Sequence, residues 1–193
     1  MLLLIAGLLV FLGAHSVRIF AEPWRAARIA GHGLAAYKAV HSIVSLLGFA
    51  LIVVGYGQAR GSPIALWDPP LWTRHVSALL VLFAFVLLVA AYVPRNHIRA
   101  AVGHPMVAGV KVWAAGHLLA NGSLADVLLF GGFLLWAALD FRAARRRDRV
   151  NGKLAVRASL PGDVATVVVG VALWAAFAFY LHGWLFGVRP FVT

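Results

Sequence analysis

The sequence predicts an all-α polytopic membrane protein, a bundle of about six transmembrane helices, and three observations support this prediction. Of the 193 residues, 63% are hydrophobic and only 12% are charged, and the mean hydropathy is +0.90. A chain of this composition has too few polar residues to cover a water-exposed surface. The apolar residues also gather in long segments without the strict alternation of barrel strands, which favours helices.

Six apolar segments follow one another, and most are long enough to cross the roughly 30 Å hydrocarbon core of a bilayer. They cover approximately Leu2–Phe20, Ala39–Tyr56, Val76–Tyr92, Met106–Ala120, Leu124–Phe141 and Val164–Phe186. We expect the first to stay uncleaved, because no basic region precedes it. The fourth is the shortest, and we expect Asn121-Gly122 to join it to the fifth in a tight hairpin with Gly122 left-handed. Leu160-Pro-Gly-Asp163 predicts a turn with Asp163 as the N-cap of the last helix.

Positive charge predicts the orientation of these helices. With six spans, the first, third and fifth loops share one side of the membrane, and they hold thirteen of the seventeen basic residues: Arg18, Arg25, Arg28, Lys38, Arg95, Arg99, Arg142, Arg145, Arg146, Arg147, Arg149, Lys153 and Arg157. The positive-inside rule places these loops, including a basic loop at about 142–160, in the cytoplasm and both termini in the periplasm. The net charge of +11 therefore indicates contact with anionic lipid in a bacterial inner membrane, and not nucleic-acid binding.

Several classes of chemistry are excluded by the residue types. The chain has no cysteine, which excludes disulfides, iron–sulfur ligation and covalently attached haem. Its six carboxylates lie at expected helix ends or in loops, so no pair of the hydrolase kind is predicted. The motifs of zinc proteases, serine hydrolases and phosphate-binding loops are also missing from the sequence. Histidine is the residue type that remains for binding or catalysis.

The eight histidines differ in their expected depth. Loop positions suit His32 and His97 as solvated residues, and His75 and His182 lie where they would anchor helix ends. The other four, His15, His41, His104 and His117, belong to helices whose cytoplasmic ends meet in the predicted topology. A polar group at membrane depth is costly unless it faces a packed interior, a cofactor or water. These four are the candidate site residues.

Two of the candidates have a cation three residues away on the same helical face. His15 is paired in this way with Arg18, and His41 with Lys38. A neutral imidazole backed by a cation suits haem, because the iron takes the imidazole nitrogen and the propionates take the cation. The alternative is that Arg18 and Lys38 only extend to the lipid headgroups. Spacing does not separate these two interpretations.

His104 and His117 cannot bind one ligand from a single helix face. They lie 13 positions apart, which is roughly 140° around a helix axis at about 100° per residue. His104 precedes Pro105 and is expected at the helix entrance, as an interfacial residue or N-terminal cap. His117 lies about 20 Å farther along, in a segment rich in small residues that lets a helix or a flat macrocycle approach. Its position suits either a metal ligand or a hydrogen-bonded core histidine.

The central block resembles the signature of the NnrU family of bacterial membrane proteins. It reads His104-Pro-Met-Val-Ala-Gly-Val-Lys-Val-Trp-Ala-Ala-Gly-His-Leu-Leu-Ala-Asn-Gly122 and is followed by Leu-Leu-Phe-Gly and Trp136. Gly13-Ala-His-Ser-Val-Arg18 and Tyr37-Lys-Ala-Val-His-Ser42 extend the resemblance to nearly the whole chain, as a single NnrU-type domain over residues 1–193. The family is associated with denitrification, near genes for nitrite and nitric oxide reduction. Its domain is shared with the plastid 15-cis-zeta-carotene isomerase, a haem b enzyme.

The resemblance implies a haem b site. It places His15 and His117 as the axial ligands of the haem iron, with His41 and His104 as further pocket residues and Arg18 and Lys38 beside them. His15 with His41 is the rival ligand pair, because their expected depths match. Since the chain has no cysteine, thiolate ligation is excluded.

Two functions are compatible with such a site. One is a haem-binding factor that supports denitrification, with membrane partners from that system and a haem, nitric oxide or quinone signal. The other is a haem-dependent cis-trans isomerase of a carotenoid or other isoprenoid polyene, which predicts a long apolar slot beside His117. The sequence does not decide whether the protein is an enzyme.

Overall fold

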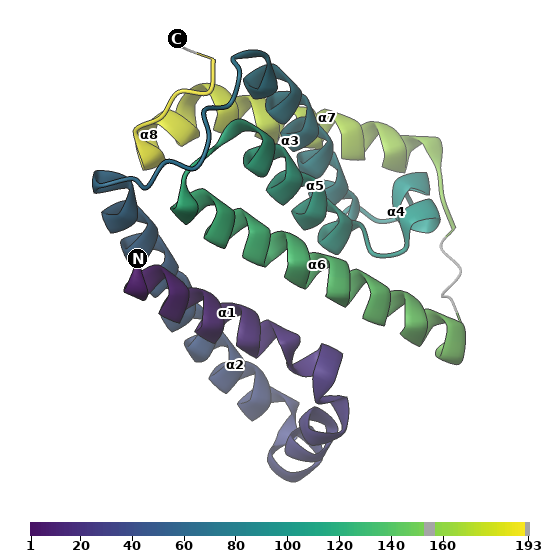
Figure 1. Ribbon diagram of the computed structural model, residues 1–193. Helices are drawn as coiled ribbons and strands as arrows, with labels where there is room; N and C mark the ends of the chain where they lie inside the picture. Colours follow the sequence, from purple (N-terminus) through teal and green to yellow (C-terminus); the bar gives the residue numbers. More distant parts are fainter. Residues whose placement is uncertain (153–156, 192–193) are drawn as a thin grey trace. The chain divides into compact units, whose positions relative to one another are not determined.

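The computed structural model describes residues 1–152 and 157–191, and these residues are almost entirely helical (Figure 1). The helices are α1 (Leu2–Phe20), α2 (Glu22–Gly61), α3 (Trp72–Ala90), α4 (His97–Val102), α5 (Pro105–Ala120), α6 (Leu124–Asn151), α7 (Leu160–Ala176) and α8 (His182–Phe186). A π-helical turn, η1 (Phe177–Leu181), joins α7 to α8 in one continuous rod. The predicted all-α class is confirmed.

Among the residues that the structure describes, five helices are long and apolar enough to cross a membrane. They are α1, α2, α3, α6 and the rod Leu160–Phe186. The remaining predicted span corresponds to α5, which has 16 residues and is therefore about 24 Å long at 1.5 Å per residue. That length is below the roughly 30 Å of a bilayer core. The protein is thus a membrane protein with at least five candidate spans, while six spans and the orientation of the termini stay predictions.

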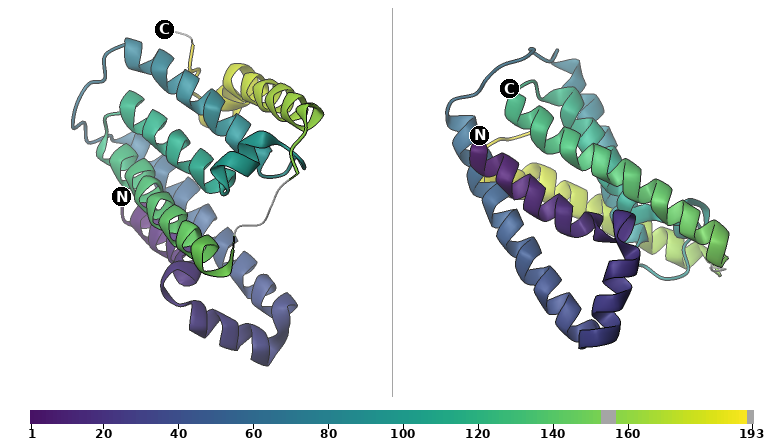
Figure 2. Two further views of the ribbon diagram at one scale, coloured as in Figure 1. Left: turned by 90° about the vertical axis from the view of Figure 1, so that its right-hand side faces the viewer. Right: turned by 60° about the horizontal axis from the view of Figure 1, so that its bottom comes forward.

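Helix α2 begins much earlier than the predicted segment at Ala39. Glu22 starts the helix and Pro23 occupies its first turn, where a missing N–H costs nothing. The following residues include several alanines and arginines, which are good helix formers. At Gly33 the backbone takes φ 83° and ψ 157°, a conformation that a residue without a Cβ adopts easily. Figure 2 shows the resulting sharp bend between the two arms of α2.

Three further predictions about local structure are corrected. The basic loop expected at about 142–160 is wrong for residues 142–151, which continue α6, because arginine and alanine are good helix formers. Residues 153–156 of that loop, Lys153 among them, lie outside the described residues. Gly122 is not left-handed, since the backbone is already extended at Asn121, whose side-chain amide donates to the His117 carbonyl at 2.8 Å. The N-cap of α7 is Ser159 and not Asp163, because the Ser159 hydroxyl accepts from the Gly162 amide.

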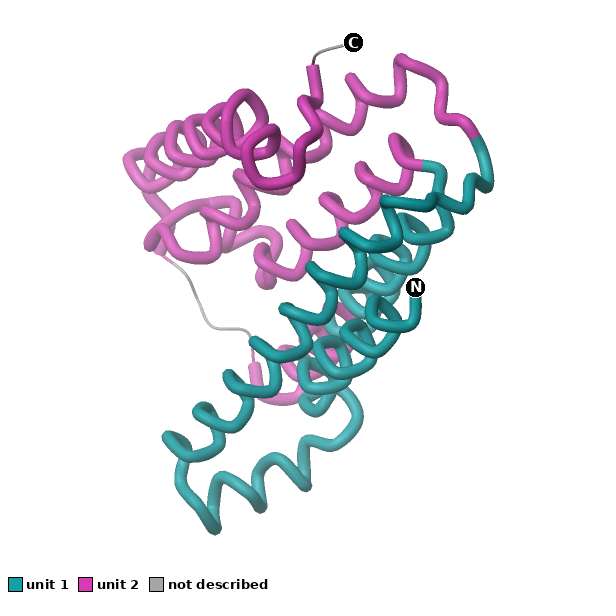
Figure 3. The backbone as a smooth tube through the Cα atoms, turned by 90° about the vertical axis from the view of Figure 1, so that its left-hand side faces the viewer, with its two compact units in different colours: residues 1–67, 122–140 teal, residues 68–121, 141–193 magenta. Residues whose placement is uncertain are grey.

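The chain forms two compact units, which Figure 3 shows in different colours. Unit 1 contains Met1–Trp67 and Gly122–Asp140, and unit 2 contains Asp68–Asn121 and Phe141–Thr193. Helix α6 therefore contributes its first part to unit 1 and its last part to unit 2. Of the candidate site residues, His15 and His41 belong to unit 1, and His104 and His117 to unit 2.

In unit 1, glycines let the backbones of α1 and α2 approach closely. A Cβ on Gly48 would lie 2.7 Å from the Phe11 nitrogen, and a Cβ on Gly7 would lie 2.6 Å from the Ile52 nitrogen. A Cβ on Gly55 would overlap the backbone of Leu4. These contacts pair increasing numbers in α1 with decreasing numbers in α2, so the two helices are antiparallel. Small residues at such contacts are the usual device for close helix packing in membranes.

A second set of contacts attaches the first part of α6 to α2. The Tyr56 hydroxyl donates to Asp126 at 2.5 Å, and the other oxygen of this buried carboxylate accepts from the amide and hydroxyl of Ser123. The backbone of the segment after α2 also bonds to the start of α6, for example from the Leu124 amide to the Ile64 carbonyl at 2.9 Å. These contacts hold the end of α2 and the start of α6 together within unit 1.

In unit 2, α3 packs against both α5 and α7. A Cβ on Gly109 of α5 would lie 3.0 Å from the Ala84 carbonyl, and a Cβ on Gly170 of α7 would lie 2.9 Å from the Val86 Cα. The small-residue face of α5 is therefore occupied by a helix. The short helix α4, which the sequence did not predict, is capped by the fully buried Asn96, whose side-chain oxygen accepts from the Arg99 amide at 2.6 Å.

Candidate functional site

The packing of α1 on α2 brings His15 against His41. One helical turn after Phe11 on α1 and two turns before Gly48 on α2, the two imidazoles lie edge to face with ring centroids 4.9 Å apart. The glycine contacts thus set the register that places two histidines together inside unit 1.

His15 is held in one tautomer by its own helix. Its Nδ1 lies 2.7 Å from the carbonyl oxygen of Phe11, four residues earlier. A carbonyl only accepts, so Nδ1 carries the hydrogen and, in the neutral ring, Nε2 carries the lone pair. The Phe11 ring stacks on the imidazole with centroids 4.2 Å apart and planes 26° apart, which fixes the ring orientation. This tautomer is the one that a metal-ligating histidine needs when it binds through Nε2.

His117 has the same local arrangement in unit 2. Its Nδ1 lies 3.0 Å from the carbonyl oxygen of Trp113, again four residues earlier, and the Trp113 ring lies 5.1 Å from the imidazole. The unprotonated nitrogen of its neutral ring is therefore also Nε2. Both predicted axial ligands thus have an aromatic residue one turn earlier that orients the imidazole and accepts from Nδ1.

His41 differs from both. Its Nδ1 lies 3.4 Å from the Ser45 hydroxyl, one turn later in α2, and the Tyr37 ring lies 6.2 Å away. A hydroxyl can donate as well as accept, so this contact does not place the hydrogen on Nδ1. The tautomer of His41 is therefore not fixed in the manner of His15.

The predicted cations lie close to the histidine pair along the chain, and both are exposed. The Arg18 Nε lies 4.0 Å from Glu22, and its side chain is 58% exposed. Lys38 is exposed on α2, one turn before His41. Glu22 accepts a shorter contact from Arg25 at 2.8 Å, and the Arg25 guanidinium lies over the Tyr37 ring at 5.5 Å. Exposed cations close in the chain to the histidine pair suit anionic groups at the surface of a membrane.

The geometry of these residues fits a haem that takes one axial ligand from this pair, His15, better than a haem held between His15 and His41. Metal–imidazole bonds of about 2 Å on both sides of an iron would separate the ring centres by about 6 Å, with a macrocycle between them. The two rings lie 4.9 Å apart in direct contact, which leaves no space for that plane. Within residues 1–152 and 157–191, no three of His, Cys, Asp and Glu gather into a metal site. His15 therefore fits a single axial ligand, with His41 as its neighbour.

His104 occupies the predicted place but has a different partner. It is the N-cap residue of α5, with no side-chain bond to the helix. Its Nε2 instead lies 2.9 Å from Asp148 on the last part of α6, and its ring meets the edge of Phe141. His104 thus joins two helices of unit 2. Since His15 and His117 belong to different units, their pairing as axial ligands stays a prediction.

Trp136 is a further residue beside the histidine pair that the sequence did not indicate as a site residue. It lies on the part of α6 that belongs to unit 1, with its ring 6.0 Å from His15 and nearly perpendicular to it. Its indole Nε1 is buried and has no hydrogen-bond partner among the described residues. The only sequence signal was its place after the His104–Gly122 block.

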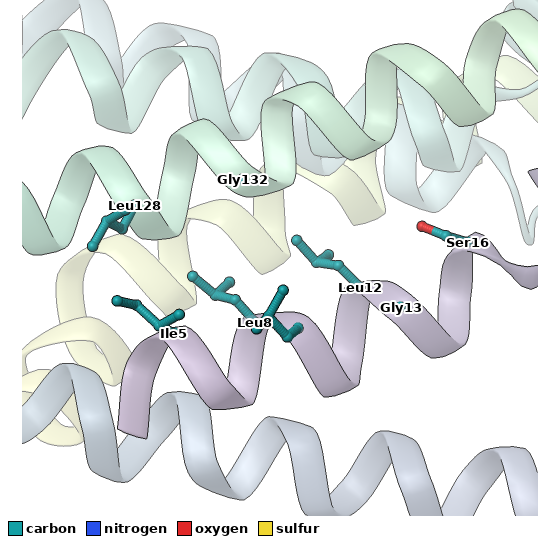
Figure 4. Close-up of a pocket in the computed structure, with 8 residues that line it drawn as sticks. Ile5, Leu8, Leu12, Gly13, Ser16, Leu128 and Gly132 are labelled. Atoms are coloured by element: carbon teal, nitrogen blue, oxygen red, sulfur yellow. The ribbon is translucent and has the colours of Figure 1, made fainter. Parts of the chain in front are cut away.

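Unit 1 also contains an apolar groove (Figure 4), and its cavity volume is about 330 Å³. The lining residues come from α1 and α6: Ile5, Leu8, Leu9, Leu12, Gly13, Ser16, Leu128 and Gly132. The groove belongs to unit 1 and His117 to unit 2, so the slot expected beside His117 stays a prediction. The sequence contains no pattern that would have located the groove.

The family model described as NnrU protein matches residues 3–190, nearly the whole chain. No curated protein and no solved structure matches the chain.

Proposed function

The chain belongs to the NnrU family, and we propose that it is a haem b-binding protein of the bacterial inner membrane that supports nitrite or nitric oxide reduction in denitrification. The observation that carries the haem proposal is the hydrogen bond from His15 Nδ1 to the Phe11 carbonyl. It presents Nε2 as a ligand nitrogen on a helix that is apolar enough to cross a membrane. Family membership supports the proposed role in denitrification.

The polar groups of unit 1 suit this cofactor. When bound, haem b supplies an iron that can change its oxidation state or bind a small ligand. Phe11 orients the imidazole of His15, and His41 adds a second polar group beside it. Arg18 and Lys38 supply exposed positive charge for the propionates. His117, with its equivalent Trp113 contact, is the proposed second ligand.

Absorption spectra of the detergent-purified protein, oxidised and then reduced with dithionite, test the proposal. After expression with added haem precursor, we expect a Soret band that is lost or shifted in His15→Ala and His117→Ala. His32→Ala is the matched control, because His32 is an exposed histidine on α2, and it should keep the parent spectrum. Adding imidazole to a His15→Gly variant should restore the band by replacing the missing ligand.

Two results would overturn the proposal in different ways. A haem-supplied protein without a Soret band contradicts haem binding. A Soret band that survives both His15→Ala and His117→Ala contradicts the ligand assignment. Loss of the band in His15→Ala but not in His41→Ala would identify His15, and not its neighbour His41, as the ligand.

The second candidate function is haem-dependent cis-trans isomerisation of a carotenoid or other isoprenoid polyene. The groove between α1 and α6 favours it, because a long apolar substrate needs an apolar slot and Ser16 of the lining is next to His15 in the chain. Incubating the reduced holoprotein with a cis polyene, followed by chromatography of the isomers, tests this function. Conversion that is absent from His15→Ala supports it, and an unchanged isomer ratio with fully loaded holoprotein contradicts it.

A further inference from the structure

The last part of α6 has one face that consists of exposed arginines. They follow one another at spacings of three, one and three residues, and all of them are exposed: Arg142, Arg145, Arg146 and Arg149. At about 100° per residue they lie within roughly 100° of one another around the helix axis. Residues three or four apart are neighbours on a helix surface. These side chains therefore form one continuous basic strip, which we call the arginine face.

Another side of this part of α6 packs inside unit 2. Ala144 is buried, and the Asp148 carboxylate lies 2.9 Å from His104 Nε2 at the start of α5. The Lys111 ammonium of α5 lies over the Phe141 ring, 4.8 Å from its centroid. These contacts fix the rotation of the helix about its axis, so the arginine face points away from α5.

The arginine face has no counter-charge of its own. Within residues 1–152 and 157–191, none of its four arginines forms an ion pair with a carboxylate. Asp148 follows Arg145 by three residues, but its carboxylate is bonded to His104 instead. Like charges three or four residues apart on a helix repel each other. An external anion would relieve this repulsion, so the face indicates an anionic partner.

The position of the face along α6 selects the class of anion. The apolar part of the helix, Leu124–Phe141, is about 27 Å long at 1.5 Å per residue, close to the roughly 30 Å of a hydrocarbon core. The arginine face begins at the next residue and rises about 10 Å, whereas a headgroup layer is about 5–7 Å thick. Phospholipid phosphates are the anions at this level. A soluble partner would have to enter the headgroups to reach Arg142.

We propose that the arginine face is a binding site for anionic phospholipids, with the guanidinium groups holding the lipid phosphates. Arginine matches a phosphate with two parallel N–H donors, and clusters of cations directly beside a transmembrane segment attract anionic headgroups. The positive-inside rule requires only a surplus of cations in a loop, wherever they point. The proposal adds that alignment on one exposed face retains anionic lipid more strongly than the same charge placed elsewhere.

Native mass spectrometry of the full-length protein in detergent tests this site, because it counts the lipids that stay bound. Phosphatidylglycerol and phosphatidylcholine with identical acyl chains are added in turn, so that the headgroup is the only difference. We expect the parent protein to retain phosphatidylglycerol in preference to phosphatidylcholine. Equal retention of the two lipids would show that the acyl chains are sufficient, and would overturn the proposal.

A pair of substitutions tests the face itself. Arg142→Gln with Arg146→Gln removes two neighbouring guanidinium groups and keeps good helix formers. Each arginine near a membrane surface contributes about fivefold to the affinity for anionic lipid, so phosphatidylglycerol should bind about thirtyfold more weakly. Arg28→Gln with Arg74→Gln is the matched control, because both are exposed arginines on other helices, and it should bind like the parent. An equal loss in the control would mean that net charge, and not this face, binds the lipid.

Lysine replacements separate charge from geometry. Arg142→Lys with Arg146→Lys keeps the charge and the topology signal but loses the paired donors, so we expect a loss of binding smaller than that of the glutamine pair. Parent-like binding in the lysine pair would refute the role of the guanidinium groups, and this pair still tests the site if the glutamine pair fails to insert. An RNA oligonucleotide that displaces phosphatidylglycerol at equal phosphate concentration would assign the face to a soluble polyanion instead.

The site is independent of the proposed haem, since it uses none of the residues proposed to hold that group. His15→Ala, which should lose the Soret band, is expected to retain phosphatidylglycerol like the parent. Failure of the haem proposal and failure of this one therefore give different results.

Discussion

Replacing Gly48 by alanine should destabilise unit 1, because this glycine brings the α1 and α2 backbones into contact. The added Cβ would lie 2.7 Å from the Phe11 nitrogen and 3.0 Å from its Cα and Cβ. Carbon contacts are most favourable at about 3.5–4.0 Å, so the helices must separate by about 0.8 Å. The atoms in the way are mainly backbone, and a change of rotamer cannot relieve them.

The magnitude follows from comparison with Gly57→Ala. Gly57 lies on the same helix and is exposed, and a Cβ added to it would meet nothing within 4 Å. Both substitutions gain the same helix propensity, up to about 1 kcal/mol. The difference between the two variants is therefore the overpacking cost alone, which is about 1–3 kcal/mol in packed interiors. Gly55→Ala should cost more than Gly48→Ala, since its Cβ would overlap the Leu4 backbone.

Unfolding of the detergent-purified variants by sodium dodecyl sulfate, followed by tryptophan fluorescence and circular dichroism, measures these differences. The expected order of stability is Gly57→Ala, then Gly48→Ala, then Gly55→Ala. Equal unfolding midpoints for Gly48→Ala and Gly57→Ala would refute the close approach of α1 and α2, and with it the register that brings His15 to His41.

Two further predictions concern polar contacts within a unit. Tyr56→Phe removes the hydrogen bond to the buried Asp126 and should lower the free energy of unfolding by about 1–2 kcal/mol. Tyr180→Phe is the control, because Tyr180 is 76% exposed, and it should leave the free energy of unfolding unchanged. Equal effects of the two substitutions would contradict the Tyr56 contact. A double-mutant cycle of His104→Gln with Asp148→Asn should give a coupling energy below about 1 kcal/mol, because both side chains are partly exposed. A larger value would mean that this pair has a role beyond joining α5 to α6.

Hydrophobic segments could be predicted well from the sequence, because the bilayer imposes a length and an apolar composition on each span. The predicted first segment coincides with α1, and the others lie within or close to observed helices. The errors lie in the polar stretches. Residues 22–38 and 142–151 were expected as loops on account of their charges, yet they are helical. Charge at a membrane surface does not break a helix, since arginine is a good helix former.

The candidate histidines could also be found from the sequence, but their neighbours could not. The His15–His41 contact depends on which glycines of α1 and α2 meet, and several registers are compatible with the composition of the two helices. Trp136 comes from a helix 121 positions away from His15 in the chain. A contact of that kind is a product of tertiary packing and has no local periodicity to reveal it.

One local pattern would have narrowed the choice of ligand. An aromatic residue precedes a histidine by four positions three times, in Phe11–His15, Tyr37–His41 and Trp113–His117. In all three the rings lie near each other, but only His15 and His117 direct Nδ1 to the carbonyl of that aromatic residue. His41 has Ser45 one turn later, and its Nδ1 lies against that hydroxyl instead. The aromatic residue orients the ring, while the partner of Nδ1 decides which nitrogen carries the lone pair. The pattern therefore selects three candidates, and the absence of a competing hydroxyl reduces them to the two histidines proposed as haem ligands.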